Sequence, residues 1–409
     1  MRVLLIGGGG REHALGWALS RSPRVDELIS LPGNPGLGEL GTLVEGVKPT
    51  DVGAVAALAR VHRVDLAVVG PEAPLAAGVA DALATLGIPV FGPTRAAARL
   101  ESSKTFAKEV MRRAGVATAE AETFTDPIAA LGHLNNREGP FVVKADGLAA
   151  GKGVLVTDSR EEAAAWADHC LRGGLDGAGE KVVIEDYLDG PELSVFAVCT
   201  EEGARAMEPA RDYKRLLDDG QGPNTGGMGA YSPVRDLGPG FVEEVMKSVI
   251  VPVWEQMGEE ESPFTGFLYA GLVLAEDGPK VLEFNVRMGD PEAQVVLPRL
   301  ANDLVEVLEG EAPEWSAKTA VDVVLAAKGY PTDPETGSAI SGLDNVPDDV
   351  LVFHAGTARE DGRLVVAGGR VLSVVGMGPT VTEARERAYA GVDAVNWPGV
   401  SYRNDIGLG

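Results

Sequence analysis

The segment from Glu283 to Glu292 concentrates the residue types that can do chemistry. Glu283, Asn285 and Arg287 stand two positions apart, so in a strand their side chains share one face. A carboxylate and an amide carbonyl are hard oxygen ligands suited to a magnesium ion that also binds phosphates. A neighbouring arginine can stabilise the oxyanion of a developing acyl phosphate. The pattern predicts a metal site on a strand, although a solvated strand face could carry the same residues.

A loop of small residues joins two predicted strands and carries a lysine near each end, Lys144 and Lys152. It departs from a Walker A loop, because Gly147 and Gly151 are separated by three residues instead of four. Gly153 also replaces the Ser or Thr that would bind magnesium. We expect this loop to fold over phosphates as a lid, with an exposed hairpin as the alternative.

Two further segments favour ligand binding. The apolar strand at 181–187 runs into an acidic hinge, where backbone groups of Asp186 to Leu188 could pair with adenine and Glu192 could hold ribose hydroxyls. A core strand followed by a polar turn would also explain that segment. The density of glycine at 222–230 is conformationally expensive in a purely structural loop. It therefore indicates that the backbone closely approaches a ligand.

A run of glycines, residues 7–10, follows the first predicted strand and opens a helix. The third glycine of a dinucleotide fingerprint is absent, which disfavours an NAD-dependent oxidoreductase. Free N–H groups at a helix N-terminus can still bind any phosphate, and a tight structural turn is the alternative.

The elements that must position these residues follow from the alternation of apolar runs. Strands and helices alternate over residues 1–100, with one helix expected over 74–86, which predicts an α/β domain with a parallel sheet. Residues 101–320 read as an α+β region with long antiparallel strands, and 118–185 as a mobile lid within it. Residues 321–409 form a small mixed β domain, with a helix opened by the capping box that starts at Thr380.

Composition excludes several classes of protein. The chain has 409 residues, which suggests about two to four domains. Its net charge of −25 disfavours binding to nucleic acid or to an anionic membrane surface. Two isolated cysteines, Cys170 and Cys199, make a disulfide framework or structural zinc site improbable and suit the cytoplasm. No apolar run reaches the length of a membrane span.

Nine phrases, in order, resemble the ATP-grasp enzymes, and more narrowly the phosphoribosylamine–glycine ligase family of purine synthesis. They are GGGGREHAL, PGNPG, VGPEAPL, FGPT, KADGLAAGKGV, GPNTGGMGAYSP, TGFLYAGL, EFNVRMGDPE and FHAGT. The resemblance implies that 101–320 is an ATP-grasp region. It also implies that ATP phosphorylates glycine to glycyl phosphate, which the amine of 5-phosphoribosylamine attacks. Magnesium or manganese is the implied cofactor, and the implied partners are small molecules, with the chain a monomer or weak homodimer.

The resemblance also implies roles for individual residues. The metal ligands would be Glu283 and Asn285, and the catalytic residues near the reacting carboxylate would be Arg287, Asp212 and Asp290. The residues expected to bind ATP are Lys104, Lys144, Gly147, Gly151, Lys152, Gly153, Glu185, Asp186, Tyr187, Leu188 and Glu192. Those expected to bind glycine or the phosphoribosyl group are Gly9, Gly10, Glu12, Gly33, Asn34, Gly36, Gly70, Pro71, Glu72, Asn224, Thr225, Gly226, Gly227 and Gly289.

Two positions depart from the ATP-grasp pattern. A second metal-binding glutamate is expected on the preceding strand, where this chain has Tyr269 or Ala270. A second metal ion would then use Glu283 twice, Asp212 or water. Tyr213 stands where the family has a histidine, which excludes an essential imidazole there. The remaining alternatives are an ATP-grasp ligase that activates bicarbonate or formate, and a nucleotide-binding regulator without turnover.

Overall fold

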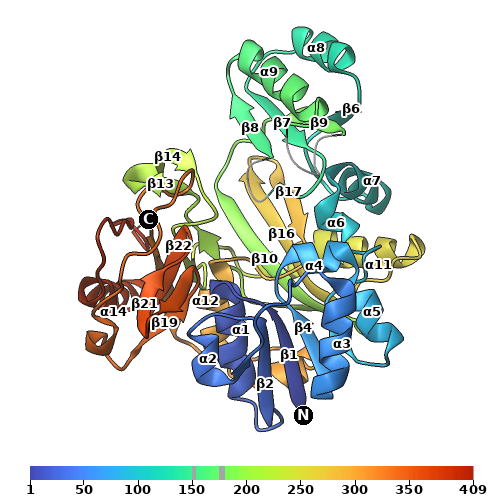
Figure 1. The fold of residues 1–409 in the computed structure, drawn as a ribbon. Helices are drawn as coiled ribbons and strands as arrows, with labels where there is room; N and C mark the ends of the chain where they lie inside the picture. Colours follow the sequence, from blue (N-terminus) through green and yellow to red (C-terminus); the bar gives the residue numbers. More distant parts are fainter. Residues whose placement is uncertain (150–152, 175–179, 409) are drawn as a thin grey trace.

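The computed structural model describes residues 1–149, 153–174 and 180–408. Two residues expected to bind ATP, Gly151 and Lys152, lie outside the described residues. Figure 1 shows the chain as an N-terminal sheet, a small unit that stands apart at one end, a long central sheet and a C-terminal sheet. The predicted multidomain α/β and α+β architecture is therefore confirmed.

The N-terminal sheet has five parallel strands, as the alternation of strands and helices predicts. In spatial order they are β3 (Thr42–Leu43), β2 (Glu27–Pro32), β1 (Arg2–Gly7), β4 (Leu66–Val69) and β5 (Val90–Phe91). The helices between them are α1 (Gly10–Ser20), α2 (Leu37–Leu40), α3 (Val52–His62), α4 (Glu72–Ala77) and α5 (Val79–Thr85). A single helix was expected over 74–86, but Gly78 adopts a φ of 96° and divides it into α4 and α5.

The unit at the top of Figure 1 is a four-stranded antiparallel sheet covered by two helices. Its strands are β6 (Ala121–Phe124), β9 (Val182–Asp186), β7 (Phe141–Ala145) and β8 (Val154–Thr157), and its helices are α8 (Pro127–Asn135) and α9 (Arg160–Leu171). The unit has its own hydrophobic core, built around Phe141, Val143 and Leu134. We call it the lid unit. Helices α6 (Arg99–Ser102) and α7 (Lys104–Ala114) lead into it.

The central sheet is antiparallel and contains the three long strands that the apolar runs predict. Its order is β11 (Gly203–Ala206), β10 (Glu192–Thr200), β16 (Gly266–Ala275) and β17 (Gly278–Asn285). Helices α10 (Phe241–Val245) and α11 (Val251–Glu259), joined by a π-helical turn, precede β16. Helices α12 (Glu292–Val296) and α13 (Leu304–Leu308) follow β17.

The C-terminal sheet takes strands from two distant parts of the chain. Its order is β12 (Arg211–Asp212), β15 (Gly229–Ser232), β18 (Thr319–Ala326), β22 (Arg370–Gly378) and β19 (Val350–His354). Helix α14 (Val381–Ala394) packs against it, and the Thr380 hydroxyl accepts the N–H of Glu383 as the capping box predicts. Two hairpins, β13 (Arg215–Leu217) with β14 (Gln221–Asn224) and β20 (Thr357–Glu360) with β21 (Arg363–Val366), flank the sheet.

Two compositional predictions can be compared with the fold. Cys170 and Cys199 are both free and buried, so neither forms a disulfide. Among the described residues, none of the helices combines the length and apolar character that a membrane crossing requires.

Candidate functional site

A cleft opens between the lid unit, α7 and β17. Most residues expected to contact phosphates and metal line it, although they come from segments as far apart as 104 and 285. They are Lys104, Lys144, Gly147, Gly153, Glu283 and Asn285, and Glu185, expected beside adenine, lines the cleft as well. Arg287 and Glu72 line the same cleft. The antiparallel pairing of β7 with β9 and of β16 with β17 brings these side chains together.

Glu185 lies at the centre of a charge cluster on the lid side of the cleft. It is buried, and its carboxylate pairs with Lys144 and, at 2.7 Å, with Lys108 Nζ. Lys144 Nζ also donates to the carbonyl of Leu282 at 3.1 Å, which joins the lid unit to β17. The Glu185 side chain was expected beside adenine. The structure pairs it with the two lysines.

Lys104, at the first turn of α7, approaches the small-residue loop directly. Its Nζ donates to the carbonyl of Gly147 at 3.2 Å. Burial lowers the pKa of Lys104, while the carboxylate of Glu283 partly opposes that shift. Gly147 has a φ of 130°, a conformation that favours glycine. The start of the loop is thus tied to α7.

The end of β17 presents the expected pair of oxygen ligands on one face. Asn285 Nδ2 lies 3.5 Å from Glu283 Oε1, so the two side chains are adjacent. Withdrawal from bulk water opposes the charge of Glu283, but nearby lysines, Lys144 first, outweigh it and lower the pKa of this carboxyl. Glu283 therefore remains a carboxylate at neutral pH, which suits a metal ligand.

Arg287 extends the same surface and is fixed by two carboxylates from the N-terminal region. Its Nη2 lies 3.0 Å from Glu101 Oε1, and its Nε lies 3.3 Å from Glu72 Oε2. Glu101 also accepts the backbone N–H of Val286 at 2.8 Å. Burial raises the pKa of Glu101 to about 7 in spite of Arg287. Arg287 is thus oriented before any ligand binds.

The strand next to Glu283 has no second carboxylate at the expected place. In the register of β16 with β17, Tyr269 is opposite Asn285 and Gly271 is opposite Glu283. The Tyr269 hydroxyl instead lies 2.9 Å from Ser194 Oγ, which donates to Glu292 at 3.2 Å. The nearest strand neighbour of Glu283 is therefore a glycine and not a metal ligand.

A buried acidic cluster lies beyond Tyr269. Burial, followed by the charge of Asp212, raises the pKa of Glu292 to about 7. Asp212 Oδ1 lies 3.3 Å from Lys214 Nζ, and Lys214 also pairs with Glu192. Glu192 was expected on the ribose and Asp212 beside the reacting carboxylate. The structure joins both to one lysine.

The proposed adenine hinge lies at the end of β9 and does not line the cleft as the lysines do. Asp186 pairs with Arg137 of the lid unit, and its N–H donates to the carbonyl of Glu120 at 2.9 Å. Tyr187 is half-exposed. Leu188 follows it in the segment that leads from the lid unit to β10.

The glycine turn before α1 is closed by its own side chains. Glu12 is buried and accepts the N–H of Gly9 at 2.6 Å, while Arg11 Nε pairs with its other oxygen at 2.5 Å. A Cβ at Gly70 would lie 2.3 Å from the Glu12 carboxylate, so the turn before Pro71 needs glycine there. Glu12 was expected to bind substrate. Its carboxylate is instead occupied by Gly9 and Arg11.

The 33–36 turn also has internal partners. Asn34 Nδ2 donates to the carbonyl of His354 at 2.8 Å, and Asn34 Oδ1 accepts the N–H of Leu37 at 3.0 Å. A Cβ at Gly36 would lie 2.1 Å from the ring of His13. Gly33 has a φ of 71°. These residues therefore hold the N-terminal sheet against the C-terminal sheet.

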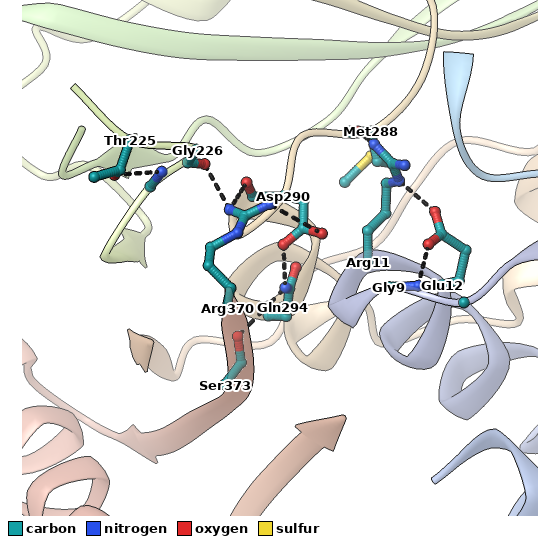
Figure 2. Close-up of polar contacts among 12 residues, drawn as sticks. Gly9, Arg11, Glu12, Thr225, Gly226, Met288, Asp290, Gln294, Arg370 and Ser373 are labelled. Carbon is teal, nitrogen blue, oxygen red and sulfur yellow. Dashed lines mark hydrogen bonds and ion pairs between the residues drawn. The ribbon is translucent and has the colours of Figure 1, made fainter. Parts of the chain in front are cut away.

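Four segments meet where α1 begins, and Figure 2 shows their polar contacts. We call this region the junction, and it comprises residues 9–13, 225–227, 288–294 and 370–373. Asp290 Oδ1 accepts from Gln294 Nε2 at 2.7 Å, and Asp290 Oδ2 lies 3.5 Å from Arg370 Nη2. Burial opposes ionisation of Asp290, but Arg370, Arg11 and the hydrogen bond from Gln294 together outweigh it and lower the pKa of Asp290.

The junction also places Gly10 and the glycine-rich loop near Asp290. A Cβ at Gly10 would lie 2.5 Å from Gln294 Nε2. Thr225 Oγ1 accepts the N–H of Gly227 at 3.0 Å. Asn224, at the end of β14, is exposed, and Gly289 packs against Glu292.

Several residues of the site escaped the sequence analysis. They are Lys108, Glu101, Glu292, Tyr330 and Arg370. Lys108 follows Lys104 by four positions and so shares its helix face, which is a signal that could have revealed it. Glu292 ends the segment at 283–292, but the sequence assigns it no role of its own. The other three act through partners that are distant in sequence, and no local pattern marks them.

Models of the phosphoribosylglycinamide synthetase family match three consecutive stretches of the chain. Its N domain matches residues 1–101, its ATP-grasp (A) domain 102–293 and its C domain 320–409. The phosphoribosylamine–glycine ligase of Caulobacter vibrioides is 47% identical over 100% of this chain and 98% of the relative. That of Streptomyces coelicolor is 49% identical over 99% of this chain and 98% of the relative.

Two solved structures are also similar to the chain. The crystal structure of phosphoribosylamine–glycine ligase from Thermotoga maritima superposes with a TM-score of 0.86 at 37% identity, covering 99% of this chain and 100% of the other. The biotin carboxylase domain of 2-oxoglutarate carboxylase from Hydrogenobacter thermophilus gives a TM-score of 0.75 at 16% identity, covering 98% and 91%. The second likeness concerns the fold alone.

Proposed function

The chain belongs to the phosphoribosylglycinamide synthetase family, and from that premise we propose how its cleft and junction ligate glycine to 5-phosphoribosylamine. The reaction is the ATP-dependent step of purine biosynthesis that gives glycinamide ribonucleotide, ADP and phosphate. The observation that carries the assignment is one cleft that contains both lysines and oxygen ligands, namely Lys104, Lys144, Glu283, Asn285 and Arg287.

ATP binds with its phosphates against Lys104 and Lys144 and beneath the loop that includes Gly147 and Gly153. The adenine contacts the hinge at 186–188, and Glu192 holds the ribose. Because the N–H of Asp186 already donates to Glu120, the backbone donor to adenine comes from Tyr187 or Leu188. Glu185 balances Lys144 and Lys108, and so sets the charge that meets the triphosphate.

A magnesium or manganese ion is held by the Glu283 carboxylate and the Asn285 carbonyl oxygen. The two side chains are adjacent, with Asn285 Nδ2 3.5 Å from Glu283 Oε1, so a half-turn of the amide would direct its oxygen towards an ion that Glu283 holds. The described part of the chain has no cluster of three His, Cys, Asp or Glu residues that could hold a metal alone. The donor set therefore fits an ion whose other ligands are phosphate oxygens and water. When bound, the ion neutralises phosphate charge.

Glycine binds beside Arg287, with its carboxylate towards the γ-phosphate. Attack of a carboxylate oxygen on that phosphorus gives glycyl phosphate and ADP. Arg287, pre-oriented by Glu101 and Glu72, stabilises the charge that develops on the acyl oxygen. Asp290, Gly289 and Asp212 bound the same site. The amine of 5-phosphoribosylamine then attacks the glycyl carbonyl, and phosphate leaves.

The phosphoribosyl group lies against the turns around Gly9, Gly10, Gly33 and Gly70. Since Glu12 and Asn34 are occupied within the protein, they shape these turns. The N–H groups of Gly9, Gly33 and Gly70 also have acceptors within the protein, so the phosphate contacts the N–H of Gly10 at the start of α1. The 224–227 loop covers the acceptor side.

The proposed roles fall on three segments of the chain. Residues 1–100 form the acceptor domain, residues 101–320 the ATP-grasp region and residues 321–409 the C-terminal domain. The lid at 118–185 closes on ATP; its separate hydrophobic core supports movement as one body. We place the enzyme in the cytoplasm as a monomer or weak homodimer.

Phosphate release with glycine, formate or bicarbonate, each with 5-phosphoribosylamine and MgATP, tests the assignment. Glycine alone is expected to stimulate release. Stimulation by formate or bicarbonate but not by glycine would assign the cleft to another ATP-grasp ligase, and no stimulation by any acid would favour a nucleotide-binding regulator.

A further inference from the structure

Both backbone polar groups of Gly226 are bonded to the C-terminal domain. The N–H of Gly226 donates to the Tyr330 hydroxyl at 2.9 Å. The carbonyl of Gly226 accepts from Arg370 Nη1 at 2.6 Å, as Figure 2 shows. Neither partner belongs to the segment that carries the loop, because Tyr330 follows β18 and Arg370 begins β22. The C-terminal domain therefore sets the position of the loop.

Arg370 joins the loop to the 288–294 segment. Its Nη1 also donates to the carbonyl of Asp290 at 2.5 Å, and its Nη2 lies 3.5 Å from the Asp290 carboxylate. A guanidinium has a planar fork of donors, which allows one side chain to hold several oxygens in fixed directions. Arg370 therefore sets the spacing between Gly226 and Asp290.

The loop fits closely against both partners. A Cβ at Gly226 would lie 3.0 Å from Arg370 Cζ, and one at Gly227, whose φ is 112°, would lie 2.4 Å from Pro291 Cδ. The glycines of this loop are therefore explained by contacts within the protein. A ligand on the other side of the loop meets backbone whose position Arg370 and Tyr330 determine.

We propose that Tyr330 and Arg370 are positioning residues that hold the Gly226 backbone beside Asp290 and so form the acceptor side of the site. The inference rests on the proposed assignment of the 224–227 loop to the acceptor substrate. It gives the C-terminal domain a role in binding 5-phosphoribosylamine, whereas ATP binds between the lid unit and β17, where neither residue lies.

The test uses two variants of the full chain, each with a matched control in the same domain. Arg370→Met removes bonds to two carbonyls. Arg385→Met does the same elsewhere, because Arg385 donates to the carbonyls of Ile406 and Asn404. Tyr330→Phe removes one hydroxyl. Its control is Tyr389→Phe, which removes a hydroxyl bonded to Arg403 O and Ile406 N.

We expect Arg370→Met to lower kcat/KM for 5-phosphoribosylamine about 30- to 100-fold, since a misplacement of about 1 Å has effects of this size. Tyr330→Phe, which loses one hydrogen bond, is expected to lower it about 5-fold. The KM for ATP should stay within about twofold in both. The controls should show unchanged kinetics and a loss of thermal stability similar to that of their counterparts.

The proposal is overturned if Arg370→Met and Tyr330→Phe match their controls, or if the KM for ATP and for 5-phosphoribosylamine rise together. If Arg370→Met fails to fold, Tyr330→Phe decides, because it leaves the Asp290 contacts in place. If the unaltered enzyme releases no phosphate in response to glycine and 5-phosphoribosylamine, the proposed function itself fails, which is a separate result.

Discussion

The cleft and the junction are built in opposite ways. In the cleft, charged side chains from β7, β9, β17 and α7 face an open volume, and several pair with one another, as Lys144 does with Glu185. In the junction, arginines bond to backbone carbonyls, as Arg11 does with Met288 and Arg370 does with Gly226 (Figure 2). A ligand that enters the cleft can replace these ion pairs. The junction fixes the shape that a ligand meets.

This difference predicts that substitutions in the cleft reduce activity more than stability. Glu283→Gln should lower turnover about 10³-fold, because the proposed metal ligand and its charge are lost. The melting temperature should change little, since Glu283 lines the open cleft and does not pack in the core. Phosphate release and a thermal melt measure the two quantities. Asp277→Asn, on the turn of the same hairpin and paired with Lys280, is the control, and equal turnover in both variants would remove the metal assignment.

Arg287 lines the cleft and also pairs with two carboxylates, Glu72 and Glu101. Its substitution should therefore lower both activity and stability. Arg287→Met should lower the free energy of unfolding by about 3 kcal/mol, since Glu101 is left buried without its partner. Adding Glu101→Gln should recover much of that stability but no activity. Urea unfolding and phosphate release on both variants measure this. Recovery of activity in the double variant would contradict a catalytic role for Arg287.

On the junction side, two buried histidines, His13 and His354, should make the stability of the protein depend on pH. Burial lowers the pKa of His13 to about 3 and that of His354 to about 4. Well above pH 6.5 both histidines are neutral in the folded and in the unfolded chain, so neither lowers the free energy of unfolding. Below it the unfolded chain binds protons that the folded chain does not, so each histidine costs about 2 kcal/mol by pH 5.

Urea unfolding at pH 8 and pH 5 measures this loss. His13→Asn retains an acceptor for the N–H of His354, which His13 Nδ1 accepts at 2.7 Å. The variant should lose about 2 kcal/mol less between the two pH values than the unaltered chain. An identical pH dependence in both would show that His13 is not the group that titrates.

The smallest expected effect comes from Lys108. Lys108→Met leaves the buried Glu185 with one lysine fewer, so its negative charge opposes the triphosphate more strongly. The KM for ATP should rise about 10-fold, equivalent to about 1.4 kcal/mol. Arg112→Ala, an exposed residue of the same helix that pairs with Glu109, is the control. A KM equal to that of the control would exclude Lys108 from the nucleotide site.

The same contrast explains what the sequence could predict. The lysines and oxygen ligands of the cleft are recognisable by type, and the period of two along β17 places Glu283 and Asn285 on one face. Long apolar runs also identify β10, β16 and β17. One helix was expected to continue through Gly78. It stops there because Gly78 adopts a positive φ, which the sequence pattern does not reveal.

The residues that hold the site in place could not be found in this way. Glu101 meets Arg287 across 186 positions of the chain, and Arg370 meets Gly226 across 144. Neither has a local pattern, since an arginine that begins a strand or a glutamate in a short helix is ordinary. Glu12 and Asn34 show the converse. Their types suit ligand binding, yet their partners lie within the protein.

The C-terminal sheet has a consequence for synthesis of the chain. Strand β15 ends at Ser232, and its partner β18 begins at Thr319. The ribosome must add residues 233–318 before the pair can form, which takes roughly 4–17 s at about 5–20 residues per second. During that interval the edge of β15 that pairs with β18 is open to other strands, so the nascent enzyme is most prone to aggregate before β18 emerges.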